Sequence, residues 1–177
     1  MSKMRLATVW LSGCSGCHMS FLDMDERLIS LAERVDLVYS PLVDVKEFPE
    51  NVDITLVEGS VGHEEDWRRI HTIRQRTKIL VSFGDCAVTA NVPSMRNLYG
   101  TEATLQRIYQ EAEVLQPQIP NQVVPRLLTR VRPVHEVVKV DLFMPGCPPS
   151  ADTIYFFLIE LVEGRTPDLH TRTRFGA

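Results

Sequence analysis

The sequence lacks the features that mark a membrane-spanning, nucleic-acid-binding or exported protein. None of its apolar runs approaches the roughly 20 residues that span a bilayer. Basic residues are not in excess, because 19 Lys and Arg stand against 23 Asp and Glu, which argues against a nucleic-acid partner. The basic start at residues 1–5 leads into only a short apolar stretch, unlike a signal peptide. We therefore expect a cytoplasmic protein with no membrane span.

Cysteine is scarce as well, with four in a chain of 177 residues. Disulfides are not expected among them, because a cytoplasmic compartment keeps thiols reduced. A chain of this length also buries a sufficient core without such cross-links. The cysteines therefore indicate metal binding or redox chemistry. They are Cys14, Cys17, Cys86 and Cys147.

The chain contains no internal repeat and no low-complexity tract, and we predict one domain over residues 1–177. Apolar runs typical of strands alternate with segments of helical periodicity. The expected strands are residues 5–10, 35–39, 53–57, 78–83 and 137–143. The expected helices are residues 19–34, 63–75, 101–115, a short one at 124–129, and one from Ser150, a suitable N-cap, to Gly164.

This alternation predicts an α/β fold, with a flavodoxin-like parallel sheet and helices on both of its faces. Right-handed crossovers then place the carboxyl ends of all strands on one edge, where ligands bind in such folds. The cysteines follow the first, fourth and fifth expected strands, and Glu58 follows the third. The sequence therefore predicts a metal site at this edge of the sheet.

Four thiolates suit either zinc or an iron–sulfur cluster. Zinc sites often use two close cysteine pairs, whereas here the pair Cys14 and Cys17 is joined by two distant cysteines, which favours a cluster. A structural zinc protein remains an alternative. A second alternative is a dithiol oxidoreductase with a thiol of lowered pKa at a helix N-terminus. It leaves Cys86 and Cys147 unexplained. A flavin at this edge lacks a phosphate-binding loop after the first strand.

Four motifs resemble the small subunits of nickel–iron hydrogenases and the related cluster subunit of respiratory complex I. They occur in the same order over almost the whole chain, at residues 12–17, 57–61, 84–87 and 145–149. The complex I subunit carries adjacent cysteines at the first motif, whereas two residues separate Cys14 from Cys17, as in hydrogenases. The short chain is similar to the small subunit of soluble, bidirectional hydrogenases, above all the NAD-reducing type.

The resemblance implies an electron-transfer subunit that is not catalytic alone. It implies that the nickel–iron centre lies on a separate large subunit, and that a diaphorase with further clusters, flavin and NAD receives the electrons. Acceptors other than NAD stay open: NADP, a deazaflavin or a sulfur compound would also be reached through other subunits. The implied cofactor of this chain is one [4Fe–4S] cluster held by Cys14, Cys17, Cys86 and Cys147.

Three further residues lie next to these motifs. The resemblance places Glu58 near the cluster and the large subunit, where its carboxylate would relay protons, and the alternative is a solvated turn residue. His18 either donates to a cluster sulfur or caps the loop, and we favour the cap. Asp85 is expected to cap a helix that begins at Cys86.

Overall fold

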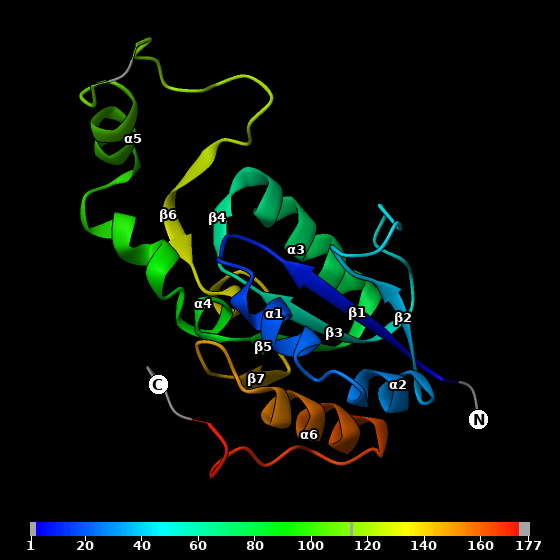
Figure 1. Ribbon diagram of the computed structural model, residues 1–177. Coiled ribbons are helices and arrows are strands. Elements are labelled where there is room, and N and C mark those ends of the chain that lie inside the picture. The colour runs from blue at the N-terminus through cyan, green and yellow to red at the C-terminus, as the bar shows by residue number, and fades with distance from the viewer. Residues whose placement is uncertain (1–2, 114, 174–177) are drawn as a thin grey trace.

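A parallel five-stranded sheet forms the centre of the molecule (Figure 1). The structure is a computed structural model, and it describes residues 3–113 and 115–173. The strands of the sheet are β1 (Met4–Trp10), β2 (Val35–Tyr39), β3 (Val52–Glu58), β5 (Thr77–Phe83) and β7 (Leu142–Met144). They lie in the order β2-β1-β3-β5-β7, and every neighbouring pair is parallel. Counted within the sheet alone, this is the 2-1-3-4-5 order of flavodoxin-like folds, which confirms the predicted fold class.

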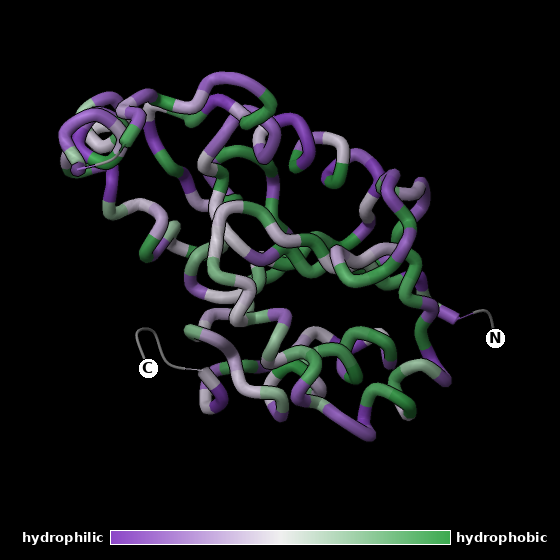
Figure 2. The backbone as a smooth tube through the Cα atoms, turned by 45° about the horizontal axis from the view of Figure 1, so that its top comes forward, coloured by the Kyte–Doolittle hydropathy of each residue, from purple (hydrophilic) through white to green (hydrophobic). Residues whose placement is uncertain are grey.

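Helices cover both faces of this sheet. One face packs against α1 (Gly16–Leu22), α2 (Arg27–Ala32) and α6 (Ala151–Val162), and the other against α3 (Glu64–Arg76) and α4 (Asp85–Thr89). Successive side chains of a strand point to opposite faces, so Leu6 belongs to the first core and its neighbour Ala7 to the second. Figure 2 shows hydrophobic residues gathered in the central strands and hydrophilic ones along the outer turns.

The helix expected at residues 19–34 is two helices, α1 and α2, and the first begins earlier, at Gly16. Asp25 between them adopts a left-handed backbone with φ 49°, a conformation that Asp tolerates better than most residues. The turn lets Phe21 of α1 and Leu31 of α2 pack against the same core. Helical periodicity continues across residues 23–26, so it could not reveal the break.

Two further predictions need correction. The strand expected at 137–143 forms, but only as the short β7, preceded by the 3-10 turn η2 (Val134–Glu136), so its predicted start was wrong. The short helix expected at 124–129 is a strand, β6 (Leu127–Arg132), which pairs antiparallel with β4 (Val61–His63). Pairing with a distant segment decides both structures, and local propensity does not report it.

An arm projects from the carboxyl edge of the sheet (Figure 1). We define it as η1 (Val92–Leu98) and α5 (Thr101–Tyr109). The Arg96 guanidinium donates to the carbonyl oxygens of Gly62 and Leu128 at 2.8 and 2.9 Å. Asn97 bonds both backbone groups of Val131, at 2.9 and 2.8 Å. These bonds fasten the arm to β4 and β6.

The helix expected at residues 101–115 ends at Tyr109, and Leu115 at its expected end is fully exposed. Val114, in the same expected helix, lies outside the described residues. Among the helices that the structure describes, none is long and apolar enough to cross a bilayer.

Candidate metal centre

The four cysteines come from three places along the carboxyl edge of the sheet, whose strands and helices are labelled in Figure 1. Cys14 lies between β1 and α1 and Cys17 in the first turn of α1, whereas Cys86 lies in α4 and Cys147 follows β7. All four are free thiols. Cys17 and Cys86 are buried, and Cys14 and Cys147 are exposed. Two ligand candidates therefore face the interior and two face the outside of the molecule.

The cysteines are close enough to act on one another electrostatically. Burial raises the pKa of Cys86 to about 11, with further contributions from Cys14, Cys147 and Glu58. Burial also raises the pKa of Cys17 well above its ordinary value, and Glu58 and the other three cysteines add to that rise. Four thiolates together are unfavourable without a compensating positive charge. A bound cationic metal core supplies that charge and is bound with release of the thiol protons.

Gly84 leaves room for the Cys17 sulfur. Its φ is +81°, and a Cβ atom built on it would lie 2.2 Å from Cys17 Sγ. Gly16 is also tight, because its Cβ would lie 3.3 Å from Cys14 Sγ. The sulfurs of Cys17 and Cys14 therefore each lie against a glycine, and a side chain at either glycine would crowd the sulfur.

The arrangement of the donors differs from that of a single-ion site. Within the described ranges, no three His, Cys, Asp or Glu side chains are arranged to hold one metal ion. A tetrahedral zinc requires all four sulfurs about 2.3 Å from one point. A cluster with several iron atoms is larger, and its thiolate ligands stand further apart. The donor set, which is all sulfur, fits an iron–sulfur cluster.

Glu58 lies at the end of β3 and bonds the start of α1. Its carboxylate accepts the backbone N–H groups of Cys17 and His18 at 3.3 and 3.0 Å, and it pairs with His18 Nδ1. The Glu58 side chain is 2% exposed, so the alternative of a solvated turn residue is wrong. The carboxylate fixes the loop that carries Cys14 and Cys17.

His18 packs between Trp10 and Phe83, with ring centroids 5.4 and 6.3 Å away. Its Nδ1 contacts Glu58, and its Nε2 has no hydrogen-bond partner among the described residues. The favoured prediction of a loop-fixing role agrees with this pairing. The pairing itself could not be predicted, because 40 residues separate the two side chains.

Asp85 joins the loops that carry Cys86 and Cys147. Its carboxylate accepts the Gly146 N–H at 2.7 Å, and its own N–H donates to the Gly146 carbonyl at 2.9 Å. The helix α4 begins at Asp85, with Gly84 at the N-cap and no side-chain cap hydrogen bond. The prediction that Asp85 caps this helix is therefore wrong, because its carboxylate bonds the neighbouring loop.

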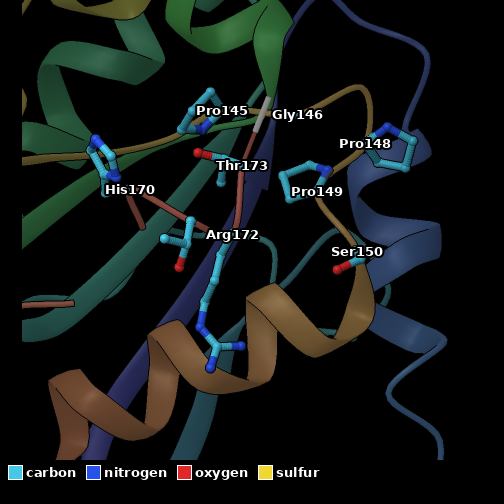
Figure 3. A pocket seen from close by; sticks show the side chains of 9 residues that line it. Pro145, Gly146, Pro148, Pro149, Ser150, His170, Arg172 and Thr173 are labelled. Atoms are coloured by element: carbon cyan, nitrogen blue, oxygen red, sulfur yellow. The ribbon is translucent and has the colours of Figure 1, made fainter. Parts of the chain in front are cut away.

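A cavity of about 510 Å³ lies beside the loop that carries Cys147 (Figure 3). Pro145, Pro149 and Ser150 line one side of it, and His170 and Arg172 of the C-terminal segment line the other. None of the four cysteines lines this cavity. The two chain neighbours of Cys147, Gly146 and Pro148, do line it, so the cavity adjoins the candidate metal centre.

Comparison with known proteins assigns the family. Residues 14–161 match the family described as NADH ubiquinone oxidoreductase, 20 Kd subunit. The chain belongs to this family.

Particular relatives are hydrogenase subunits. The NAD-reducing hydrogenase HoxS subunit delta of Cupriavidus necator is 45% identical over 174 residues, which cover 94% of this chain and 82% of the relative. A subunit of the F420-non-reducing hydrogenase vhu of Methanocaldococcus jannaschii is 37% identical over 170 residues, covering 95% of this chain and 59% of that relative. The chain thus spans only part of the archaeal relative.

Solved structures agree with this assignment. A crystal structure of an NAD+-reducing [NiFe]-hydrogenase in the H2-reduced state matches with a TM-score of 0.94 and 42% identity, over 98% of this chain and 99% of that chain. A [NiFeSe]-hydrogenase of Dm. baculatum matches with a TM-score of 0.58 and 17% identity, over 99% of this chain and 70% of that chain, and shares the fold. The resemblance to hydrogenase small subunits is confirmed.

Proposed function

We propose that this chain is the electron-transfer small subunit of a cytoplasmic, NAD-reducing nickel–iron hydrogenase. The observation that carries the proposal is the meeting of four free thiols from distant segments at one edge of the sheet. The whole-chain likeness to an NAD+-reducing [NiFe]-hydrogenase structure supports the NAD-linked type. NADP-, deazaflavin- and sulfur-linked hydrogenases remain alternatives.

In this proposal Cys14, Cys17, Cys86 and Cys147 hold one [4Fe–4S] cluster. When bound, such a cluster stores and passes on one electron at a time. The residues of this chain do the positioning: Gly84 makes room for the Cys17 sulfur, and Asp85 ties two ligand loops together. The nickel–iron centre, flavin and NAD belong to partner subunits.

Glu58 as a proton relay stays a prediction. Its carboxylate is buried next to the backbone of Cys17 and paired with His18, so two groups able to carry a proton meet there. The same contacts suit a purely structural latch. A relay requires the Glu58→Gln variant to lose hydrogen turnover while keeping its iron content.

The partners in this proposal are a hydrogenase large subunit and a diaphorase. Two candidate ligands, Cys14 and Cys147, are exposed, and a cluster on them requires cover from water. The arm beside them also exposes large apolar side chains, among them Met95 and Leu98. Exposed apolar surface of this kind is typical of protein–protein contacts. We assign the cluster edge and the arm to the large subunit.

The dithiol alternative loses support from the surroundings of Cys17. A redox-active thiol at a helix N-terminus has a lowered pKa. Burial and the neighbouring negative groups instead raise the pKa of Cys17. A buried thiol of raised pKa is a poor nucleophile for disulfide exchange.

The test is to measure iron and acid-labile sulfide per chain in anaerobically purified protein, with an EPR spectrum after reduction. We expect about four of each per chain and a reduced-cluster signal. The Cys86→Ser variant should lose both, together with hydrogen-dependent NAD reduction in the assembled complex. Zinc in place of iron, or full NAD reduction by the variant, would overturn the proposal.

A further inference from the structure

The turn at residues 90–92, where α4 gives way to the arm, brings N–H groups to two candidate ligand sulfurs. The side-chain amide nitrogen of Asn91 lies 3.7 Å from Cys147 Sγ, within hydrogen-bond reach of sulfur. The backbone N–H of Val92 bonds the Cys86 thiol. One short turn thus contacts sulfurs from two different loops of the site.

The backbone holds Asn91 in place for this contact. Ala90 adopts a left-handed conformation with φ 62°, which is uncommon for a residue other than glycine, Asn or Asp. The Asn91 carbonyl accepts the hydroxyl and the backbone N–H of Ser94 at 2.8 and 3.2 Å, and the Asn91 N–H donates to Thr89 Oγ1 at 3.4 Å. Such a conformation is costly and persists only where neighbouring contacts hold it.

The chemistry fixes which end of the Asn91 amide faces the sulfur. A metal-bound thiolate has no proton to donate, so it accepts from the amide nitrogen and cannot bond the amide oxygen. Reduction adds negative charge to a cluster and its sulfurs. An N–H donor therefore stabilises the reduced state more than the oxidised one, and hydrogen bonds to sulfur are one of the determinants of cluster potential.

We propose that Asn91 is a positioning residue for electron transfer, whose side-chain N–H bonds Cys147 and raises the reduction potential of a cluster on the four cysteines. The inference rests on the proposed function. It assigns to a side chain outside the four motifs a specific effect on the redox equilibrium. Asn91 cannot ionise, so the effect depends on hydrogen-bond donation alone.

The experiment is an EPR-monitored redox titration of the full chain, purified anaerobically with its cluster. Asn91→Leu removes the donor at similar size, and we expect a lower potential. The expected shift is about tenfold in the one-electron equilibrium constant, equivalent to about 59 mV. Asn91→Asp keeps the shape but replaces the donor by a negative charge, so its potential should fall further.

Asn97→Ala is the matched control. Asn97 lies on the same η1 segment and bonds Val131 in β6, so its loss loosens the arm without removing a donor to sulfur. Its potential should equal that of the wild type. An unchanged potential in Asn91→Leu, or an equal shift in Asn97→Ala, would overturn the inference.

A second measurement covers the case in which Asn91→Leu binds no cluster. Pulsed ENDOR of the reduced wild-type protein in D2O should then detect an exchangeable deuteron that is absent in Asn91→Asp, and equal spectra would refute the assignment. Wild-type protein without iron or sulfide contradicts the proposed function itself. A wild-type cluster with unshifted variants contradicts only the role of Asn91.

Discussion

At Gly84 a hydrogen atom stands where any other residue would carry a carbon. The position combines two demands, a φ of +81° and a sulfur of Cys17 that leaves 2.2 Å for a Cβ atom. We expect Gly84→Ala to displace Cys17 and to lower the bound iron and sulfide at least tenfold. The reason is that one candidate ligand moves out of place. Iron and sulfide assays on anaerobically purified protein measure this loss.

Gly100→Ala separates the effect of backbone strain from the effect of contact with the sulfur. Gly100 has a similar φ, +86°, but no atom lies within 4 Å of the Cβ that it would carry. Its substitution costs only the backbone strain, about 1–3 kcal/mol of unfolding free energy, and should leave the iron content unchanged. Equal iron loss in both variants would mean that backbone strain, and not contact with the sulfur, accounts for the Gly84 effect.

At the scale of elements, Asp141 connects the last two strands of the sheet. Its carboxylate accepts the Leu80 N–H at 2.8 Å and pairs with the Arg74 guanidinium at 2.5 Å. Burial alone would raise the pKa of Asp141, but these two donors outweigh burial and lower the pKa below its ordinary value of 3.8. A lowered folded-state pKa stabilises the fold above the unfolded pKa, and that contribution is lost as pH falls through the folded pKa.

We predict that Asp141→Asn lowers the unfolding free energy at pH 7 by about 1 kcal/mol. The carboxylate is part-exposed, so solvent screening limits the effect. The difference from wild type should shrink as the pH falls below about 4. Urea unfolding of both proteins at pH 7 and at a pH below about 4 measures this difference in unfolding free energy. Asp36→Asn serves as the control, because Asp36 is exposed and lies 3.9 Å from Lys3, and a similar loss there would refute the special role of Asp141.

The sequence predicts well those strands and helices whose apolar pattern is visible in their own residues. The runs of β1, β3 and β5 are buried on both faces, as a covered parallel sheet requires. The strand β6 forms because it pairs with β4, a segment far away in the sequence that meets it only in the folded chain. The local pattern of residues 127–132 carries no sign of that partner, so this strand could not be predicted.

The candidate site likewise has one part that the sequence indicates and one part that only the folded chain shows. The convergence of the cysteines on one edge could be predicted because they follow expected strands of a parallel sheet. The pairing of Glu58 with His18 and the contact of Asn91 with Cys147 join residues 40 and 56 positions apart. Asn91 also lies outside the four motifs. Only the folded chain brings these groups together, so these contacts could not be predicted.

At the scale of the whole molecule, the arm presents an apolar surface that the described part of the chain does not cover. Met95 is 63% exposed and Leu98 82% exposed, and both lie on η1. Asn91, immediately before η1, contacts Cys147, so the arm begins beside an exposed candidate ligand of the cluster. Bonds from Arg96 and Asn97 hold η1 in place, and a surface already ordered binds a partner at a smaller entropic cost.

We predict that the double variant Met95→Asp, Leu98→Asp loses the large subunit on co-purification while it keeps its iron and sulfide. Burying two new carboxylates at an apolar contact costs several kcal/mol, which is enough to dissociate a nanomolar complex at micromolar concentration. Ile29→Asp is the control, because Ile29 is 71% exposed on α2, away from the arm. Nickel and iron in the purified complex report the result. Retention of nickel by the arm variant, or loss of the diaphorase alone, would show that the large subunit does not cover the arm, because a contact that buries these two side chains cannot tolerate the added charges.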